Sequence, residues 1–143
     1  MARIKIVTPA KTIASIEIPV RITDINYGNH LGNDALISII HEARVKWLYG
    51  LGYSELNIEN SSIIMNELAV NYLHESFYGD VLDIELSIGE ISAVSFELFY
   101  SITTNRKNDC ITIAKAKTGI VFYDYHLKKA TSIPPAFRNI LEV

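Results

Sequence analysis

Hydrophobic and polar residues alternate along several stretches of the chain. In residues 15–22, isoleucines and a valine occupy every second position, and serine, glutamate, proline and arginine lie between them. A period of two is the pattern of a β-strand with one buried face. Four later stretches also have extended patterns: residues 63–75, 81–91, 94–103 and 110–125. The alternation therefore predicts five strands.

One segment, residues 34–51, has the spacing of a helix instead. Leu36, Ile40, Ala43 and Trp47 recur every three or four positions, as on one face of a helix. Further leucines and isoleucines widen this apolar surface, so we expect other structure to enclose most of the helix. Strands in succession after one helix are typical of an α+β domain with an antiparallel sheet. We expect a five-stranded antiparallel sheet around one long helix, in a single domain spanning residues 1–143.

Composition narrows the possible partners and compartment. The chain has 143 residues, of which 49% are hydrophobic, and its net charge is −3. This composition excludes disorder and makes nucleic acid a poor partner. No stretch is apolar enough to predict a membrane span or a signal peptide, so we expect a cytoplasmic protein. One cysteine and four scattered histidines predict no metal site. The apolar excess suits a partner surface or an apolar ligand.

The densest polar cluster lies in residues 21–34, between the first strand and the helix. The first turn of a helix has unpaired N–H groups and a partial positive charge, and glycines let a ligand approach the backbone. A thioester or ester carbonyl held there would have its developing oxyanion stabilised. Asp24, Asn26 and His30 could then orient or deprotonate a water molecule. We predict these three as the catalytic residues.

This loop resembles the signature of the hot-dog acyl-CoA thioesterases, the group typified by 4-hydroxybenzoyl-CoA thioesterase. The likeness lies in residues 24–33, Asp-Ile-Asn-Tyr-Gly-Asn-His-Leu-Gly-Asn, after a strand that ends in arginine, and in residues 41–44, His-Glu-Ala-Arg, on the helix. Residues 77–82 resemble the family's turn into its third strand, and residues 133–134 resemble the end of its sequence. The matching segments follow the family's order along nearly the whole chain.

The resemblance implies a curved antiparallel sheet around one helix. It also implies a homodimer or homotetramer whose acyl-CoA or acyl-carrier-protein sites lie between subunits. The expected reaction is hydrolysis of an acyl thioester without a metal or other cofactor. The predicted substrate-binding residues are Tyr27, Gly28, Asn29, Asn33 and Glu67.

One departure from the family pattern leaves the mechanism open. Many relatives have a catalytic aspartate where this chain has Asn26, and an amide cannot act as a general base at neutral pH. In the first hypothesis Asn26 orients the water or the thioester, and His30 or Asp24 is the base; we favour it because imidazole titrates near neutrality. In the second, a carboxylate such as Glu67 comes from another subunit. In the third, the site binds an acyl thioester but hydrolyses it poorly; a dehydratase of the same fold is a weaker alternative.

Overall fold

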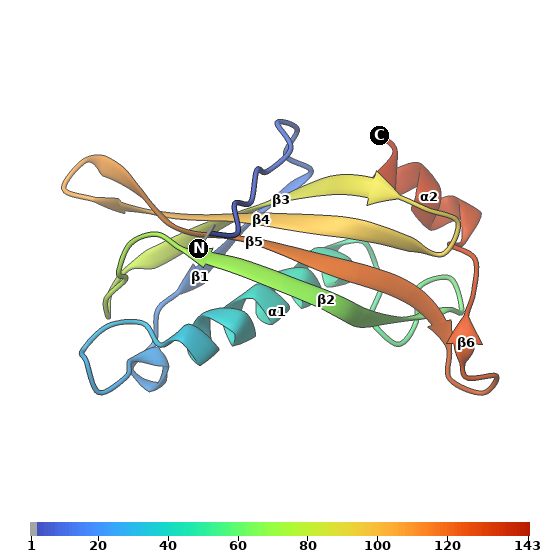
Figure 1. The fold of residues 1–143 in the computed structure, drawn as a ribbon, viewed down its shortest axis with the longest axis horizontal. Helices are drawn as coiled ribbons and strands as arrows, with labels where there is room; N and C mark the ends of the chain where they lie inside the picture. The colour runs from blue at the N-terminus through green and yellow to red at the C-terminus, as the bar shows by residue number, and fades with distance from the viewer. Residues whose placement is uncertain (1–2) are drawn as a thin grey trace.

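The structure is a computed structural model that describes residues 3–143. Its sheet is antiparallel throughout, with the strand order β1-β3-β4-β5-β2, and β6 pairs with β5. Figure 1 shows α1 lying along one face of this sheet and α2 next to the end of β3. The strands are β1 (Ala14–Pro19), β2 (Ser62–Tyr72), β3 (Val81–Ile91), β4 (Ser95–Arg106), β5 (Asp109–Asp124) and β6 (Lys129–Ala130). The helices are α1 (Asn33–Gly50), α2 (Pro135–Leu141) and the short 3-10 turn η1 (Ile22–Asp24).

The predicted sheet and helix are confirmed, with differences at strand ends and two added elements. Strand β2 ends at Tyr72 and not at residue 75, and β4 continues to Arg106 and not to residue 103. The expected first strand continued to Ile22, but β1 ends at Pro19 and Ile22 begins η1 with an exposed side chain. The reason is local: the carboxylate of Asp24 accepts a hydrogen bond from the backbone N–H of Arg21, which folds the chain into a turn. The structure also contains two elements that the sequence analysis did not predict, the two-residue strand β6 and the helix α2.

The hydrophobic core fills the space between α1 and the sheet. The helix buries one broad face that includes Leu36, Ile40, Ala43 and Leu48, each at most 1% exposed. Trp47 belongs to this core as well, since its ring packs edge-on against Phe96 of β4. The enclosed helix expected from its wide apolar surface is therefore confirmed.

The second helix closes one end of the core. The ring of Phe137 is fully buried and lies 5.9 Å from that of Trp47 and 5.6 Å from that of Phe122. Pro135 begins the helix, where its missing N–H costs nothing. A seven-residue helix is marginal alone, so burial of Phe137 is what holds α2 in place.

A β-bulge in β2 changes which side chains face the helix. Met65 pairs with Ile120 and Glu67 with Gly119, so Asn66 is an extra residue between them. Beyond the bulge, Leu68 pairs with Thr118, which is buried on the helix side of the sheet. Met65 and Leu68 therefore share the face toward α1 although they are three positions apart, and Glu67 points to the opposite face.

Candidate functional site

The loop between β1 and α1 is folded around the carboxylate of Asp24. This residue is 6% exposed. Its Oδ2 accepts hydrogen bonds from the backbone N–H of Arg21 at 2.8 Å and from the Arg21 Nε at 3.4 Å, and its Oδ1 lies 3.3 Å from the Arg21 Nη2. The backbone carbonyl of Asp24 accepts from the N–H of Gly32 at 3.0 Å. The geometry makes Asp24 the anchor of the turn.

Asn26 shapes the tip of the same loop. Its Oδ1 accepts a hydrogen bond from the N–H of Gly28 at 2.8 Å, and its own N–H donates to the carbonyl of His30 at 2.9 Å. The turn passes through Asn29 in the left-handed region, at φ 64°. Asparagine adopts that conformation more readily than most residues. Tyr27, at the tip, is fully exposed.

The imidazole of His30 stands at the edge of a cavity of about 190 Å³. Its Nδ1 lies 3.2 Å from the carbonyl oxygen of Leu31. A protonated Nδ1 donates to that oxygen, and this tautomer, assigned from the contact, leaves the Nε2 lone pair free. Nε2 lies 3.9 Å from Oε1 of Glu75, and a Cβ at Gly28 would come within 3.2 Å of it. The glycine therefore leaves room for the imidazole edge that can take a proton.

The same cavity reaches the start of α1. Asn33 and Leu36 line it from the helix, and Tyr72 lines it from the end of β2. The phenol of Tyr72 donates to the carbonyl of Asn33 at 3.0 Å, which ties the strand to the helix. In residues 3–143, the N–H groups of Asn33, Asp34 and Ala35 have no hydrogen-bond acceptor, and no side chain caps the helix. Three unpaired donors at the positive end of the helix dipole can stabilise a developing oxyanion.

Glu67 lies apart from these groups. It is on the sheet face opposite α1, 58% exposed, and its Oε1 lies 2.9 Å from the Nζ of Lys117. The hydrogen bonds that this ammonium donates to the carboxylates of Glu67 and Glu97 raise the pKa of Lys117. Within one chain, the structure thus brings together His30, the loop residues 24–29 and Asn33, but not Glu67.

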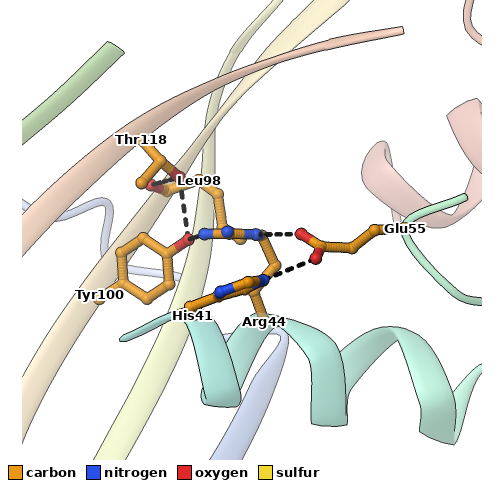
Figure 2. Close-up of polar contacts among 6 residues, drawn as sticks. All are labelled: His41, Arg44, Glu55, Leu98, Tyr100 and Thr118. Carbon is orange, nitrogen blue, oxygen red and sulfur yellow. Dashed lines mark hydrogen bonds and ion pairs between the residues drawn. The ribbon is translucent and has the colours of Figure 1, made fainter. Parts of the chain in front are cut away.

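A buried polar network beside α1 was missed by the sequence analysis. Figure 2 shows the guanidinium of Arg44 between the carboxylate of Glu55 and the phenol of Tyr100. Nε donates to Oε2 of Glu55 at 2.8 Å, and Nη1 donates to the Tyr100 oxygen at 3.0 Å. The other Glu55 oxygen lies 2.7 Å from Nε2 of His41. The available signal was an arginine inside an apolar helical stripe, because a buried cation needs partners.

The pKa directions in this network follow from burial and hydrogen bonding. Partial burial alone would raise the pKa of Glu55, but hydrogen bonds from Arg44 and His41 hold it below the ordinary value. Burial raises the pKa of Tyr100, against the opposing effect of the Arg44 charge. The network is therefore an ion pair with a neutral phenol at physiological pH.

Two classes of feature are absent from residues 3–143. No group of three or more histidine, cysteine, aspartate or glutamate side chains is placed to hold a metal ion. No helix in that range has the length and apolar character needed to cross a bilayer.

Comparison with solved structures defines the class of fold. The 1,4-dihydroxy-2-naphthoyl-CoA thioesterase from Synechocystis is 21% identical, with a TM-score of 0.79 over 89% of this chain and 93% of its own. The 4-hydroxybenzoyl-CoA thioesterase from Pseudomonas sp. strain CBS-3 is 16% identical, with a TM-score of 0.78 over 89% of this chain and 97% of its own. An Asp-to-Asn variant of a 4-hydroxybenzoyl-CoA thioesterase, complexed with 4-hydroxybenzoyl-CoA, gives a TM-score of 0.80 at 16% identity, over 90% and 97% of the two chains. The protein has the hot-dog fold.

The family follows from the sequence itself. The model of the thioesterase-like superfamily matches residues 20–141, which is most of the chain. No curated protein matches the chain in sequence. The chain belongs to the thioesterase-like superfamily, and the resemblance drawn from residues 24–33 and 41–44 is confirmed.

Proposed function

We propose that the protein hydrolyses an acyl thioester of coenzyme A or of an acyl-carrier protein. The observation that carries the proposal is the start of α1, where the N–H groups of Asn33, Asp34 and Ala35 are unpaired and Asn33 lines the cavity that His30 borders. Thioester hydrolysis needs both a donor set for the carbonyl oxygen and a base for water. Membership of the thioesterase-like superfamily supports this reaction class.

His30 is the base in this mechanism. Its Nε2 takes a proton from water as the water oxygen bonds to the carbonyl carbon, and the helix N–H groups stabilise the oxyanion. Collapse of that intermediate breaks the carbon–sulfur bond, and the thiolate takes the proton back from the imidazolium. The carboxylate of Glu75, 3.9 Å from Nε2, stabilises the imidazolium while it exists.

The remaining loop residues position these groups. Asp24 is already occupied by three hydrogen bonds from Arg21, and the Oδ1 of Asn26 by the N–H of Gly28, so neither is free to accept a proton from water. We assign Asp24 and Asn26 the role of fixing the position of His30 relative to the first turn of α1. Tyr27 and Asn29 lie at the exposed loop tip, where they can contact the carrier portion of the substrate.

We also propose that the protein is a homodimer or homotetramer with the site between subunits. Its proposed location is the cytoplasm. The His30 cavity and the edge strand β2 lie on the same side of α1, so a second copy seated there would cover the thioester. Closing such a site expels water and strengthens the electrostatic interactions inside it. Glu67 would reach a reacting group only from that second copy.

A protein that binds acyl thioesters without hydrolysing them is the second candidate. The specific observation is Asn26, which offers no carboxylate at the loop tip. If the natural protein is a weakened hydrolase, Asn26→Asp should raise its rate sharply. If His30 is the base, the same substitution should change the rate little.

The test is release of free thiol from short, medium, long and aromatic acyl-CoAs. We expect His30→Ala to lower kcat by about 10²–10⁴-fold, while His126→Ala, a matched exposed histidine, leaves kcat unchanged. Glu67→Gln tests the hypothesis that Glu67 of a second subunit is the base. If Glu67→Gln abolishes activity while His30→Ala remains active, our assignment of His30 as the base is refuted. Acyl-CoA binding without thiol release from any substrate would favour the second candidate.

A further inference from the structure

A second cavity lies further along the seam between α1 and β2. Its volume is about 140 Å³. The cavity beside His30 contacts α1 at Leu36 and β2 at Tyr72. The second cavity lies along the next turns of α1 and on the same face of β2. This is possible because β2 runs antiparallel to α1 and because the bulge turns Met65 toward the helix. Its lining residues are Ile37, Ser38, Ile40, His41, Arg44, Met65, Leu68 and Thr118.

The walls of this cavity are mostly apolar, but one end carries a surplus of hydrogen-bond donors. Arg44 is 5% exposed, and its Nε and Nη1 are occupied by Glu55 and Tyr100. Its Nη2 has no acceptor among residues 3–143, and the side chain lines the cavity. Nη2 is not among the fully buried atoms of the described residues, so water can reach it. An acyl chain that displaces this water loses free energy unless it brings an oxygen that accepts from Nη2.

The hydroxyl groups nearby do not meet this need. Because the Tyr100 oxygen accepts from Arg44, its O–H donates to the Thr118 Oγ1 at 2.9 Å. Thr118 in turn donates to the carbonyl of Leu98 at 3.4 Å. The chain of hydrogen bonds runs in one direction, from Arg44 to the carbonyl of Leu98, so both hydroxyl protons are already donated. Of these three side chains, Arg44 is the one with a donor left for an incoming acceptor oxygen.

The charges around the cavity favour a neutral oxygen. The charged or titratable side chains near it are Arg44, Glu55, His41 and Tyr100; the ion pair of Arg44 with Glu55 has no net charge, and burial keeps the phenol of Tyr100 neutral. A carboxylate would gain the Nη2 hydrogen bond but would meet the negative charge of Glu55. A hydroxyl or carbonyl oxygen gains the hydrogen bond without that repulsion.

We propose that this cavity binds the distal end of the acyl group and that Arg44 is a specificity-determining residue for it. Arg44 selects acyl chains that carry a hydroxyl or carbonyl oxygen near the end remote from the thioester. The inference rests on the proposed function, which places the thioester carbonyl at the first turn of α1.

The dimensions set the length of the acyl chain. Asn33 and Arg44 are eleven residues apart, which is about 16 Å along the helix axis. The Arg44 side chain leans back toward the helix N-terminus, which shortens the span to be bridged. The second cavity approaches the roughly 150 Å³ that accommodates benzene, enough for the end of a chain. An acetyl group cannot reach Arg44, and chains of octanoyl or decanoyl length suit the span.

The experiment compares matched substrates. We expect kcat/KM for ω-hydroxyoctanoyl-CoA to exceed that for octanoyl-CoA by about tenfold or more, since the plain chain leaves the Arg44 donor without an acceptor. Arg44→Lys keeps a positive charge facing Glu55 but lacks the second terminal nitrogen, so the preference should fall to about twofold or less. A merely structural role would lower both rates together and leave their ratio unchanged. The pair Arg44→Met with Glu55→Gln, which removes both charges, repeats the test if the lysine variant does not fold.

A cavity-filling variant provides an independent check. Leu68→Phe should lower kcat/KM for the hydroxylated chain more than for acetyl-CoA, whereas Leu56→Phe, at a 71% exposed position outside the cavity, should change neither. Equal wild-type rates for the hydroxylated and plain chains would overturn the inference. A preference for ω-carboxyoctanoyl-CoA would overturn the assignment of a neutral oxygen.

The outcomes separate this inference from the proposed function. If no acyl-CoA is hydrolysed, the proposed function fails, and calorimetric binding of the same hydroxylated and plain acyl-CoAs then decides the inference. Tighter binding of the hydroxylated chain that Arg44→Lys abolishes would support it. Equal binding, or binding of neither, would overturn it.

Discussion

The phenol of Tyr100 links two buried polar groups, and its removal should destabilise the fold. The side chain is fully buried on β4. Its oxygen accepts from the charged Nη1 of Arg44 at 3.0 Å and its O–H donates to Oγ1 of Thr118 at 2.9 Å. Tyr100→Phe keeps the ring and its packing but leaves both partners without this contact (Figure 2).

The size of the effect follows from the two hydrogen bonds. A hydrogen bond to a charged group contributes about 1.5–3 kcal/mol and a neutral one about 0.5–1.5 kcal/mol. We expect Tyr100→Phe to lower the free energy of unfolding by about 2–4 kcal/mol. For a chain of this length, each kcal/mol moves Tm by about 2–4 °C, so the fall in Tm should be several degrees or more.

Urea unfolding followed by circular dichroism, at one fixed protein concentration, measures this change. Tyr49→Phe is the matched control, because Tyr49 is 81% exposed and its hydroxyl has no hydrogen-bond partner among residues 3–143. Its free energy of unfolding should stay within about 0.5 kcal/mol of the wild type. If Tyr100→Phe is equally harmless, the buried network does not stabilise the protein and the reasoning is refuted.

Three further predictions concern other parts of the fold. The pKa of Glu55 lies below its ordinary value of 4.5, so the stability it gives is present above that pH and lost as the pH falls through the folded-state pKa. In urea unfolding, the stability deficit of Glu55→Gln at about pH 7 should therefore shrink as the pH falls below 4.5, and a constant deficit would contradict this. A Cβ at Gly28 would lie 3.2 Å from Nε2 of His30, so Gly28→Ala should lower kcat/KM on the order of tenfold in the thiol-release assay; Gly50→Ala, where the Cβ meets nothing within 4 Å, should leave it unchanged. Trp47→Ala should cost about 3–5 kcal/mol of unfolding free energy, and a loss below about 1 kcal/mol would show that the core can collapse around the missing ring.

Most of the fold was predictable because its signals are local. Alternation of apolar and polar residues placed all five long strands, β3 and β5 to within one residue at each end and β1, β2 and β4 to within three. The spacing of Leu36 to Trp47 gave α1 within a residue at each end. The error at Ile22 arose because the alternation continues there, while the Asp24 carboxylate, by accepting from the Arg21 N–H, ends the strand. Helix α2 lacks a long periodic pattern and is held by the tertiary burial of Phe137.

The candidate site was only partly predictable. The loop residues 24–33 are contiguous, so the sequence could place His30 beside the start of the helix. The sequence could not show that Glu75 would lie 3.9 Å from His30, since that contact depends on β2 returning along α1. It also could not place Glu67 on the outer sheet face, because the bulge at Asn66 reverses the alternation in β2.

The sequence by itself determined the class of the protein: its periodicities specify strands and a helix, and its loop motif places this chain among the thioesterase-like proteins. Those features act over a few residues, where side-chain spacing and turn chemistry dominate. The tertiary structure alone decided which polar groups meet. Arg44, Glu55, Tyr100 and Thr118 come from four separate elements or loops, and a buried charge is stable only when its partners arrive from elsewhere in the chain. The free donor of Arg44, on which the proposed choice of substrate rests, exists only in that assembled network.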